Sequence, residues 1–271
     1  MTQEEIQDRL VDLDAIVAAK FPGKKLPGWL MRFFKRFIHQ DWMNSFLCRG
    51  YDGVEFCDEL LKWMDIQIEV EGLENVPADG TRYTFASNHP LGAIDGISLC
   101  SLITHNFGPM KMLVNDFLLY IKPIAPLCVP INKVGSQARN LPQQIDAAYA
   151  SDNHLLMFPA GVCSRKEKGK IQDLPWTKTF INKSVETGRA IVPVHFVGRN
   201  PARFYRADWF FRKLLKIKFN IPMLFLPDAF YHAQHKTFRI ILGKPVPAAH
   251  FDSTRKPLEW AAWMREQVYQ L

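Results

Sequence analysis

A histidine and a carboxylate six positions apart are the residues of this sequence best suited to chemistry. His89 and Asp95 lie in the stretch FASNHPLGAIDG, residues 85–96. A histidine whose ring is oriented by a carboxylate is a general base that can take a proton from a substrate hydroxyl or amine. The alternative is ordinary turn chemistry, since the chain holds eight histidines.

The elements around this pair favour a chemical role. Residues 83–86 predict a short buried strand, and a helix is expected to begin near Asp95 after a tight turn. Pro90 keeps His89 out of the helical region, and Gly92 gives the turn conformational freedom. A carboxylate near a helix N-terminus is favoured electrostatically. Because α/β enzymes place reactive side chains where strands end, the pair stands at a plausible active site.

A second strand end lies in the stretch LMFPAGVCSRK, residues 156–166. The sequence predicts a strand that ends at Phe158, then a glycine turn, then a cationic loop with Arg165, Lys166, Lys168 and Lys170, opposed only by Glu167. Backbone N–H groups at a glycine turn beside arginine and lysine favour an anion site.

Two features of this stretch leave alternatives open. The charges also suit a solvated loop without a ligand. Cys163, beside Arg165, is either an activated thiol or a small buried cysteine, and the buried reading is favoured.

Composition limits the classes of function. The 271 residues are 48% hydrophobic and 23% charged, which is ordinary for a globular protein. A net charge of +7 favours an anionic partner: nucleic acid, an anionic lipid surface or an acidic substrate. Five scattered cysteines without metal-ligand spacing suit a reducing compartment. No apolar signal core or membrane-length apolar stretch is present, so we expect a soluble or peripheral protein.

The N-terminal part predicts a helical appendage, residues 1–65, before an α/β domain of residues 66–271. Helices are expected over 3–20, 28–40, 41–48 and 53–65. The second has a basic face opposite an aromatic one, as in helices that lie in a membrane interface. Its expected membrane contacts are Trp29, Phe33, Phe34 and Phe37. The alternative is a helix packed on the domain with a solvated basic face.

From Ile66 onwards strand and helix patterns alternate, which predicts an α/β fold: a mixed, largely parallel central sheet flanked by helices. Expected strands are 66–71, 83–86, 110–114, 129–132, 155–158, 190–197 and 238–242, and expected helices are 96–104, 136–150 and 257–270. A further stretch, residues 209–216, mixes aromatics with cations at helical spacing. This pattern is typical of a helix that contacts a lipid surface or of the edge of a core helix with basic flanks.

Four ordered motifs resemble the glycerolipid (lysophospholipid) acyltransferase family. They are residues 88–95 (Asn-His, then Asp), 129–133, 158–165 (Phe-Pro-Ala-Gly, then Ser-Arg) and 191–194. The similarity spans roughly residues 66–245. The Asn-His-Pro-Leu-Gly and Phe-Pro-Ala-Gly sequences are most similar to a bacterial branch described as hemolysin-like. Some relatives of that branch O-acylate acyl-amino-acid lipids such as lyso-ornithine and lyso-glycine lipids.

The resemblance implies an acyltransferase of membrane lipid synthesis. A fatty acyl group moves from an acyl carrier protein or CoA thioester, which is a co-substrate, to the hydroxyl of a lyso-lipid; no metal or other cofactor is implied. His89 is the base, Asp95 orients it, and backbone N–H groups near the turn stabilise the oxyanion. Implied substrate-binding residues are Asn88, Lys133, Gly161, Ser164, Arg165 and Lys166. The expected location is cytoplasmic, peripheral on the anionic inner face of the cell membrane.

Two departures from the family pattern bear on function. Five residues separate His89 from Asp95, where the family has four, and Ala160 replaces the glutamate of the third motif. A non-catalytic lipid-binding protein on the same fold is therefore the alternative. A nucleic-acid-binding protein is less favoured, because no recognised reader motif appears and the cations cluster with large aliphatic side chains.

Overall fold

The fold comes from a computed structural model that describes residues 2–20, 23, 26–114, 121–131, 141–167, 169–215 and 221–271. Lys133 and Lys168, both named in the sequence analysis, lie outside the described residues. The predicted helix 136–150 is described from Leu141 onwards.

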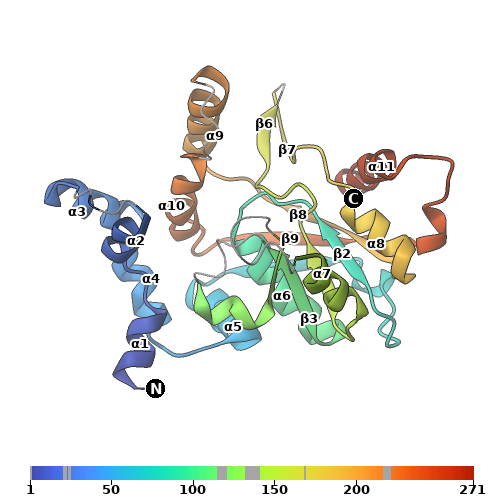
Figure 1. The fold of residues 1–271 in the computed structure, drawn as a ribbon, viewed down its shortest axis with the longest axis horizontal. Coiled ribbons are helices and arrows are strands. Elements are labelled where there is room, and N and C mark those ends of the chain that lie inside the picture. The colour runs from blue at the N-terminus through green and yellow to red at the C-terminus, as the bar shows by residue number, and fades with distance from the viewer. Residues whose placement is uncertain are drawn as a thin grey trace.

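A seven-stranded sheet forms the centre of the molecule (Figure 1), in the order β1-β9-β8-β2-β5-β3-β4. Its strands are β1 (Gln67–Glu71), β2 (Thr84–Ser87), β3 (Met110–Val114), β4 (Cys128–Pro130), β5 (His154–Met157), β8 (Ile191–Val197) and β9 (Thr237–Leu242). Within the described chain β8 and β9 pair antiparallel, and the other neighbours are parallel. The predicted mixed, largely parallel sheet is confirmed.

The position of β2 explains why the two chemical motifs meet. It lies between β8 and β5, and it is parallel to both. The carboxyl ends of parallel strands lie at the same edge of a sheet. The turn after β2 and the turn after β5 are therefore neighbours, although the chain between them is long.

Helices cover both faces of the sheet, because side chains that alternate along each strand point to opposite faces. Phe85 on β2 packs with α5 (Gly53–Trp63) and α6 (Ile94–Phe107). The next residue, Ala86, belongs to the other cluster. That cluster is covered by α7 (Leu141–Ala150), α8 (Thr179–Thr187) and α11 (Pro257–Gln270). Both sides of the strand are apolar, as expected for a buried parallel strand.

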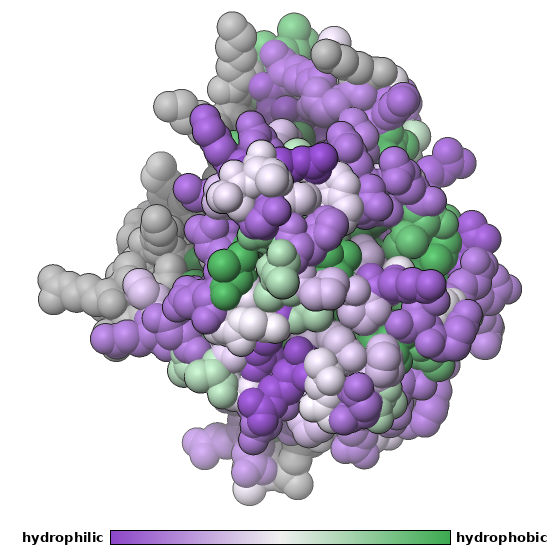
Figure 2. All heavy atoms as spheres, turned by 90° about the vertical axis from the view of Figure 1, so that its right-hand side faces the viewer, coloured by the Kyte–Doolittle hydropathy of each residue, from purple (hydrophilic) through white to green (hydrophobic). Residues whose placement is uncertain are grey.

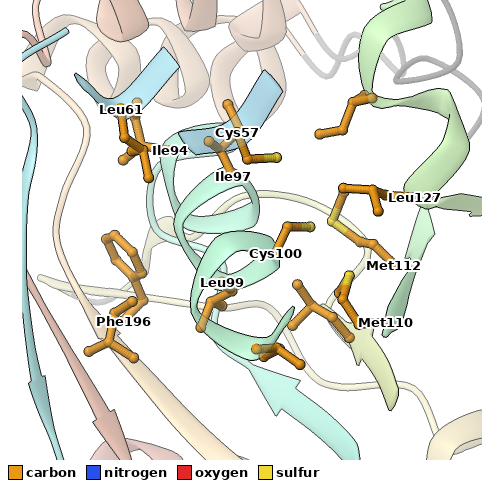
Figure 3. Packing of buried hydrophobic residues seen from close by; sticks show 14 of the residues in the cluster. Cys57, Leu61, Ile94, Ile97, Leu99, Cys100, Met110, Met112, Leu127 and Phe196 are labelled. Carbon is orange, nitrogen blue, oxygen red and sulfur yellow. The ribbon is translucent and has the colours of Figure 1, made fainter. Parts of the chain in front are cut away.

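Helix α6 carries the core on the first face (Figure 3). Leu99 lies on the side of Phe196 of β8, and Cys100 lies on the side of Met112 of β3. Cys57 of α5 hydrogen-bonds Cys100. Because α6 also contains Asp95, this packing fixes the carboxylate that follows the turn after β2.

The N-terminal helices differ in detail from the predicted ones. The single helix expected over 3–20 is two helices, α1 (Gln3–Arg9) and α2 (Leu13–Lys20). The second helix begins after Asp12, whose carboxylate caps it by accepting hydrogen bonds from the N–H groups of Asp14 and Ala15. Helix α3 (Gly28–Phe37) ends before His39, which is left-handed with φ 53°, and α4 (Gln40–Leu47) follows.

Helices α4 and α5 join the same hydrophobic cluster as the sheet, through Phe46 and Phe56 among others. The division into residues 1–65 and 66–271 stays a prediction. No helix among the described residues has the length and apolar character needed to span a bilayer.

The remaining elements among the described residues are a short hairpin, two helices and several turns of 3-10 or π-helix. The expected loop at 165–170 is a hairpin of β6 (Arg165–Glu167) and β7 (Lys170–Gln172). After β8 come α9 (Ala202–Asp208), the π-helix η5 (Trp209–Leu214), the 3-10 helix η6 (Ile221–Phe225) and α10 (Leu226–Tyr231). Short 3-10 helices are η1 (Leu73–Asn75), η3 (Lys122–Leu127) and η7 (Ala248–His250).

Candidate active site

The predicted histidine and carboxylate are in direct contact. His89 Nδ1 lies 3.0 Å from Asp95 Oδ2. Asp95 is fully buried, and its oxygens accept hydrogen bonds from the N–H groups of Leu91, Gly92 and Gly96 at 2.9 to 3.2 Å. These bonds fix the carboxylate, so the imidazole is held in one orientation. On its face the ring stacks against Phe158, with centroids 4.1 Å apart.

Gly92 makes room for the additional residue between His89 and Asp95. Its φ is +87°, a conformation that residues with a side chain rarely adopt. A Cβ at this position would lie 2.5 Å from the sulfur of Cys163. The turn is therefore wound tightly enough to bring the more distant carboxylate back to the ring.

Charge sets the protonation of this pair. Burial lowers the pKa of His89, but the charge of Asp95, together with Cys163 and hydrogen bonds from both residues, outweighs burial and raises that pKa well above its ordinary value. Burial raises the pKa of Asp95, and the opposing charge and hydrogen bonds of His89 leave it lowered. The pair stabilises an imidazolium beside a carboxylate, which is the state that forms when a base accepts a proton.

The segment that follows β5, residues 158–173, binds the backbone of His89 at both its N–H and its carbonyl. The N–H of Ser164 donates to the carbonyl of His89 at 2.7 Å. The N–H of His89 donates to Asp173 Oδ1 at 3.2 Å, and the Ser164 hydroxyl donates to the same oxygen at 2.6 Å. One buried carboxylate thus connects the turn after β2 with the segment after β5.

Asp173 is the functional residue that sequence reasoning missed. Its second oxygen accepts from Trp176 Nε1 at 2.9 Å, its N–H donates to the hydroxyl of Tyr269, and its carbonyl accepts from Arg265. A buried aspartate with this many fixed donors is a positioning group. The only sequence signal was a lone Asp next to the apolar pair Leu174-Pro175, which does not distinguish it from a turn residue.

Three predicted substrate-binding residues have structural partners instead. Asn88 is buried, and its amide bonds both the N–H and the carbonyl of Phe196 on β8, so it joins two strand ends. Ser164 is buried and bound to Asp173. Arg165 is 3% exposed and pairs with Asp208 at 3.0 Å. The hairpin turns Arg165 inwards, over the ring of Phe204, and its contact with a substrate stays a prediction.

The other predicted binding residues differ in position. Gly161 lines the cavity described below, with φ +69°. Lys166 is exposed on β6, where an anionic group can reach it. Glu167 on the same strand is occupied by Arg212 and Lys213. The one carboxylate of the cationic loop is therefore paired with two cations of η5.

Backbone donors at the turn are already engaged. The N–H groups of Leu91 and Gly92 bond Asp95, and that of Gly161 bonds the carbonyl of Phe158 at 2.9 Å. These three N–H groups thus have partners within the protein, and stabilisation of an oxyanion by backbone N–H groups near the turn stays a prediction.

An apolar cavity of about 260 Å³ opens beside His89. Its wall is formed by α4, α5, α6, β3 and α10, together with residues 158–163. Representative lining residues are Trp42, Phe46, Leu60, Ile97, Met112 and Phe230. A cavity with hydrophobic walls and few polar groups suits the alkyl chain of a ligand, with the reacting atoms next to His89.

Cys163 lines the same cavity as His89, and it contributes to the raised pKa of that histidine. The favoured reading of a small buried cysteine agrees with its burial. Its contact with the base was not foreseen, because the residues are far apart in sequence.

Comparison with known proteins identifies the class. A family model described as Acyltransferase matches residues 15–271. The chain belongs to this family. The stated resemblance is confirmed at the family level, and the protein is an O-acyltransferase.

Two curated proteins that are similar in sequence to this acyltransferase carry the name lyso-glycine lipid O-acyltransferase. The one from Phocaeicola vulgatus is 45% identical over 268 residues, 97% of this chain and 95% of that protein. The one from Bacteroides thetaiotaomicron is 45% identical over 267 residues, 97% of each. A crystal structure of the 1-acyl-sn-glycerophosphate acyltransferase PlsC from Thermotoga maritima covers 80% of this chain and 77% of its own, with 17% identity and a TM-score of 0.49.

The bonds of Asp173 generate a prediction about activity. In D173N, one oxygen becomes an amide that cannot accept, so either Trp176 or the pair of donors from His89 and Ser164 loses its partner. We expect kcat to fall by about 10- to 100-fold with KM little changed, since small displacements of a catalytic group are costly. Steady-state kinetics and a thermal melt of the same preparation measure both effects.

The matched control is D146N, which removes an exposed carboxylate paired with Lys183 and should leave kcat near that of the wild type. If D173N keeps the wild-type kcat, or loses activity only in proportion to unfolded protein, Asp173 does not position His89.

Proposed function

We propose that this acyltransferase moves a fatty acyl group from a thioester, on acyl carrier protein or coenzyme A, to the hydroxyl of an acyl-amino-acid lyso-lipid. The observation that carries the proposal is the His89–Asp95 pair, held at the wall of an apolar cavity. The names of the two curated relatives support a lyso-glycine lipid as acceptor. We also propose that the protein belongs to the hemolysin-like branch of the family.

In the proposed reaction His89 accepts the proton of the acceptor hydroxyl as its oxygen attacks the thioester carbonyl carbon. Asp95 holds the ring and stabilises the imidazolium. The tetrahedral intermediate then collapses, the carbon–sulfur bond breaks, and the imidazolium returns its proton to the leaving thiolate. The products are an ester of the lipid and a free thiol, so atoms and charge balance.

The head group of the acceptor determines which anionic group the site must bind. An acyl-amino-acid lipid based on glycine presents a carboxylate rather than a phosphate. Ala160 replaces the family glutamate, and Arg165 is committed to Asp208. Lys166 is exposed on the β6–β7 hairpin, so we propose that it binds the anionic head group of the acceptor.

An acyl-transfer assay tests the function. Wild-type enzyme is given acyl carrier protein or CoA thioesters and a panel of acceptors: an acyl-glycine lyso-lipid, lysophosphatidic acid and a lysophospholipid. We expect the acyl-glycine lyso-lipid to be the preferred acceptor. H89A should lower its turnover by about 10²- to 10⁴-fold, because a general base contributes on that order.

H105N is the control, since His105 is an exposed histidine that also pairs with an aspartate, Asp58. It should keep full activity. Preferred transfer to lysophosphatidic acid would contradict the assigned acceptor. An active, folded H89A would contradict the base, and silence across the panel would favour the non-catalytic lipid-binding alternative.

The raised pKa of His89 predicts the pH dependence. A base must be neutral to accept a proton, so kcat/KM should fall as pH drops through the pKa of His89 in the free enzyme. Because that pKa is raised, the acid limb should lie above the ordinary histidine value of about 6.5.

In D95N the stabilising charge is gone, so the acid limb should move to lower pH while the maximal rate also falls. Rate profiles of wild type and D95N over the same pH range check both statements. A wild-type limb at or below the ordinary value, or one that stays in place in D95N, would count against the assigned pair.

We also propose that the enzyme is peripheral on an anionic cytoplasmic membrane face. Trp29 and Phe33 of α3 are 66% and 57% exposed. Trp209 and Phe210 of η5 and Leu224 of η6 are also exposed. Opposite α3 in Figure 1, the side that contains α11 is mainly hydrophilic (Figure 2). Apolar side chains flanked by arginine and lysine favour an anionic bilayer.

Phe34 and Phe37, also predicted contacts, are half-buried, and Phe37 packs edge-on against Phe225. The main contacts should therefore be Trp29 and Phe33. We expect the double variant W29S/F33S to bind sedimented vesicles of anionic phospholipid at least about tenfold more weakly, because each large side chain contributes roughly 1.5–3 kcal/mol when fully buried.

The control is L258S, which removes an exposed apolar side chain of α11. It should bind vesicles as the wild type does. Equal binding by W29S/F33S would show that α3 does not contact the bilayer.

A further inference from the structure

Three potential metal ligands meet away from the catalytic pair. They are His39, which lies between α3 and α4, Asp228 of α10, and His232, the residue that caps the C-terminus of α10. Their ligand atoms all lie within 4.8 Å of one another. No metal is expected from the sequence, because its cysteines lack metal-ligand spacing and the family resemblance implies none. His39 and Asp228 are 189 positions apart, so only the fold brings them together.

The separations suit one small ion. His39 Nε2 lies 3.0 Å from Asp228 Oδ1, and His232 Nε2 lies 3.4 Å from the same oxygen. Ligands at about 2.0–2.1 Å from a tetrahedral zinc ion lie about 3.3 Å apart. Two imidazole nitrogens and one carboxylate oxygen form a ligand set that zinc prefers, and the fourth position is left for water.

The ring of His39 is held in place by its own backbone and by a neighbour. His39 has φ 53°, an uncommon conformation for a residue with a side chain. This conformation separates α3 from α4. The ring stacks on Tyr231 at 3.8 Å, with the planes 4° apart. An imidazole in a fixed orientation loses little freedom when it binds a metal.

Asp228 is oriented as a ligand with a supporting partner. It is buried, its Oδ1 faces the two histidines, and its Oδ2 forms an ion pair with Arg203 of α9. Carboxylates that bind metals are commonly held by a further donor on the second oxygen. His232, four residues after Asp228 at the C-terminal cap of α10, is half exposed, so an ion can enter from its side.

We propose that His39, Asp228 and His232 bind a divalent transition-metal ion of the zinc class. The ion would tie the junction of α3 and α4 to α10. Trp42 and Met43 of α4 line one part of the cavity wall, and Leu226 and Phe230 of α10 line another. The site is structural: it fixes two walls of the cavity, and none of its three ligands is among the described residues that line it.

The test uses full-length enzyme that has been treated with a chelator and dialysed. Zn²⁺ should raise the Tm in a concentration-dependent way, because an ion that binds only the folded state stabilises it. Co²⁺ should give visible absorption bands of a tetrahedral ion with nitrogen and oxygen ligands. In H232Q the affinity for either ion should fall at least about tenfold.

H232Q changes a half-exposed side chain, so it should fold, and its Tm without metal serves as the check. The matched control is H235N, which removes an exposed histidine that pairs only with Asp65 among the described residues. It should respond to Zn²⁺ and Co²⁺ as the wild type does. The proposal is overturned if the wild type shows neither a rise in Tm nor the Co²⁺ bands, or if H232Q responds like the wild type.

Discussion

The contact between the ring of His89 and the buried carboxylate of Asp95 is the interaction on which the site depends. A buried carboxylate is stable only when its oxygens are satisfied, and here three backbone N–H groups and one imidazole do so. The turn between the residues must wind tightly enough to supply those donors. Gly92 makes that winding possible, and α6 anchors its far end in the core.

The same requirement explains why two distant stretches of the chain fold against each other. His89 is bound at its N–H and its carbonyl by groups from the segment after β5. Asp173 completes that segment, and Trp176, Tyr269 and Arg265 hold Asp173 in turn. The position of His89 is therefore fixed by the middle of the chain and by its last helix together. This is a shared network, and its members stabilise each other more than isolated hydrogen bonds would.

The sequence predicts the fold class and the contact between His89 and Asp95 well, because both depend on local patterns. Buried strands are continuous apolar runs, and the His–Pro–Gly turn has a distinctive composition. Roles that depend on tertiary partners were less accessible. Asn88 and Arg165 are polar residues near strand ends, as ligand-binding residues often are. In the structure, however, Asn88 hydrogen-bonds the backbone of Phe196, and Arg165 forms an ion pair with Asp208. Their partners lie far along the chain, and no spacing rule connects them.

The helix boundaries show the same limit. An apolar stripe over residues 3–20 fits one helix, yet the Asp12 cap divides it, and the left-handed His39 separates two helices that the pattern would allow to run closer together. Asp173 is the extreme case, because its importance comes entirely from donors brought by three other segments.

The cavity has a consequence for how such an enzyme diversifies. Large side chains of α4 and α5 line it, whereas His89 and Asp95 belong to the turn after β2 and to the start of α6. In the proposed reaction, the length of the alkyl chain and the chemistry at its carbonyl are thus encoded by separate residues on separate elements. Substitutions at Trp42 or Phe46 would then change the length of alkyl chain that fits the cavity, while the surroundings that set the protonation of His89 stay the same.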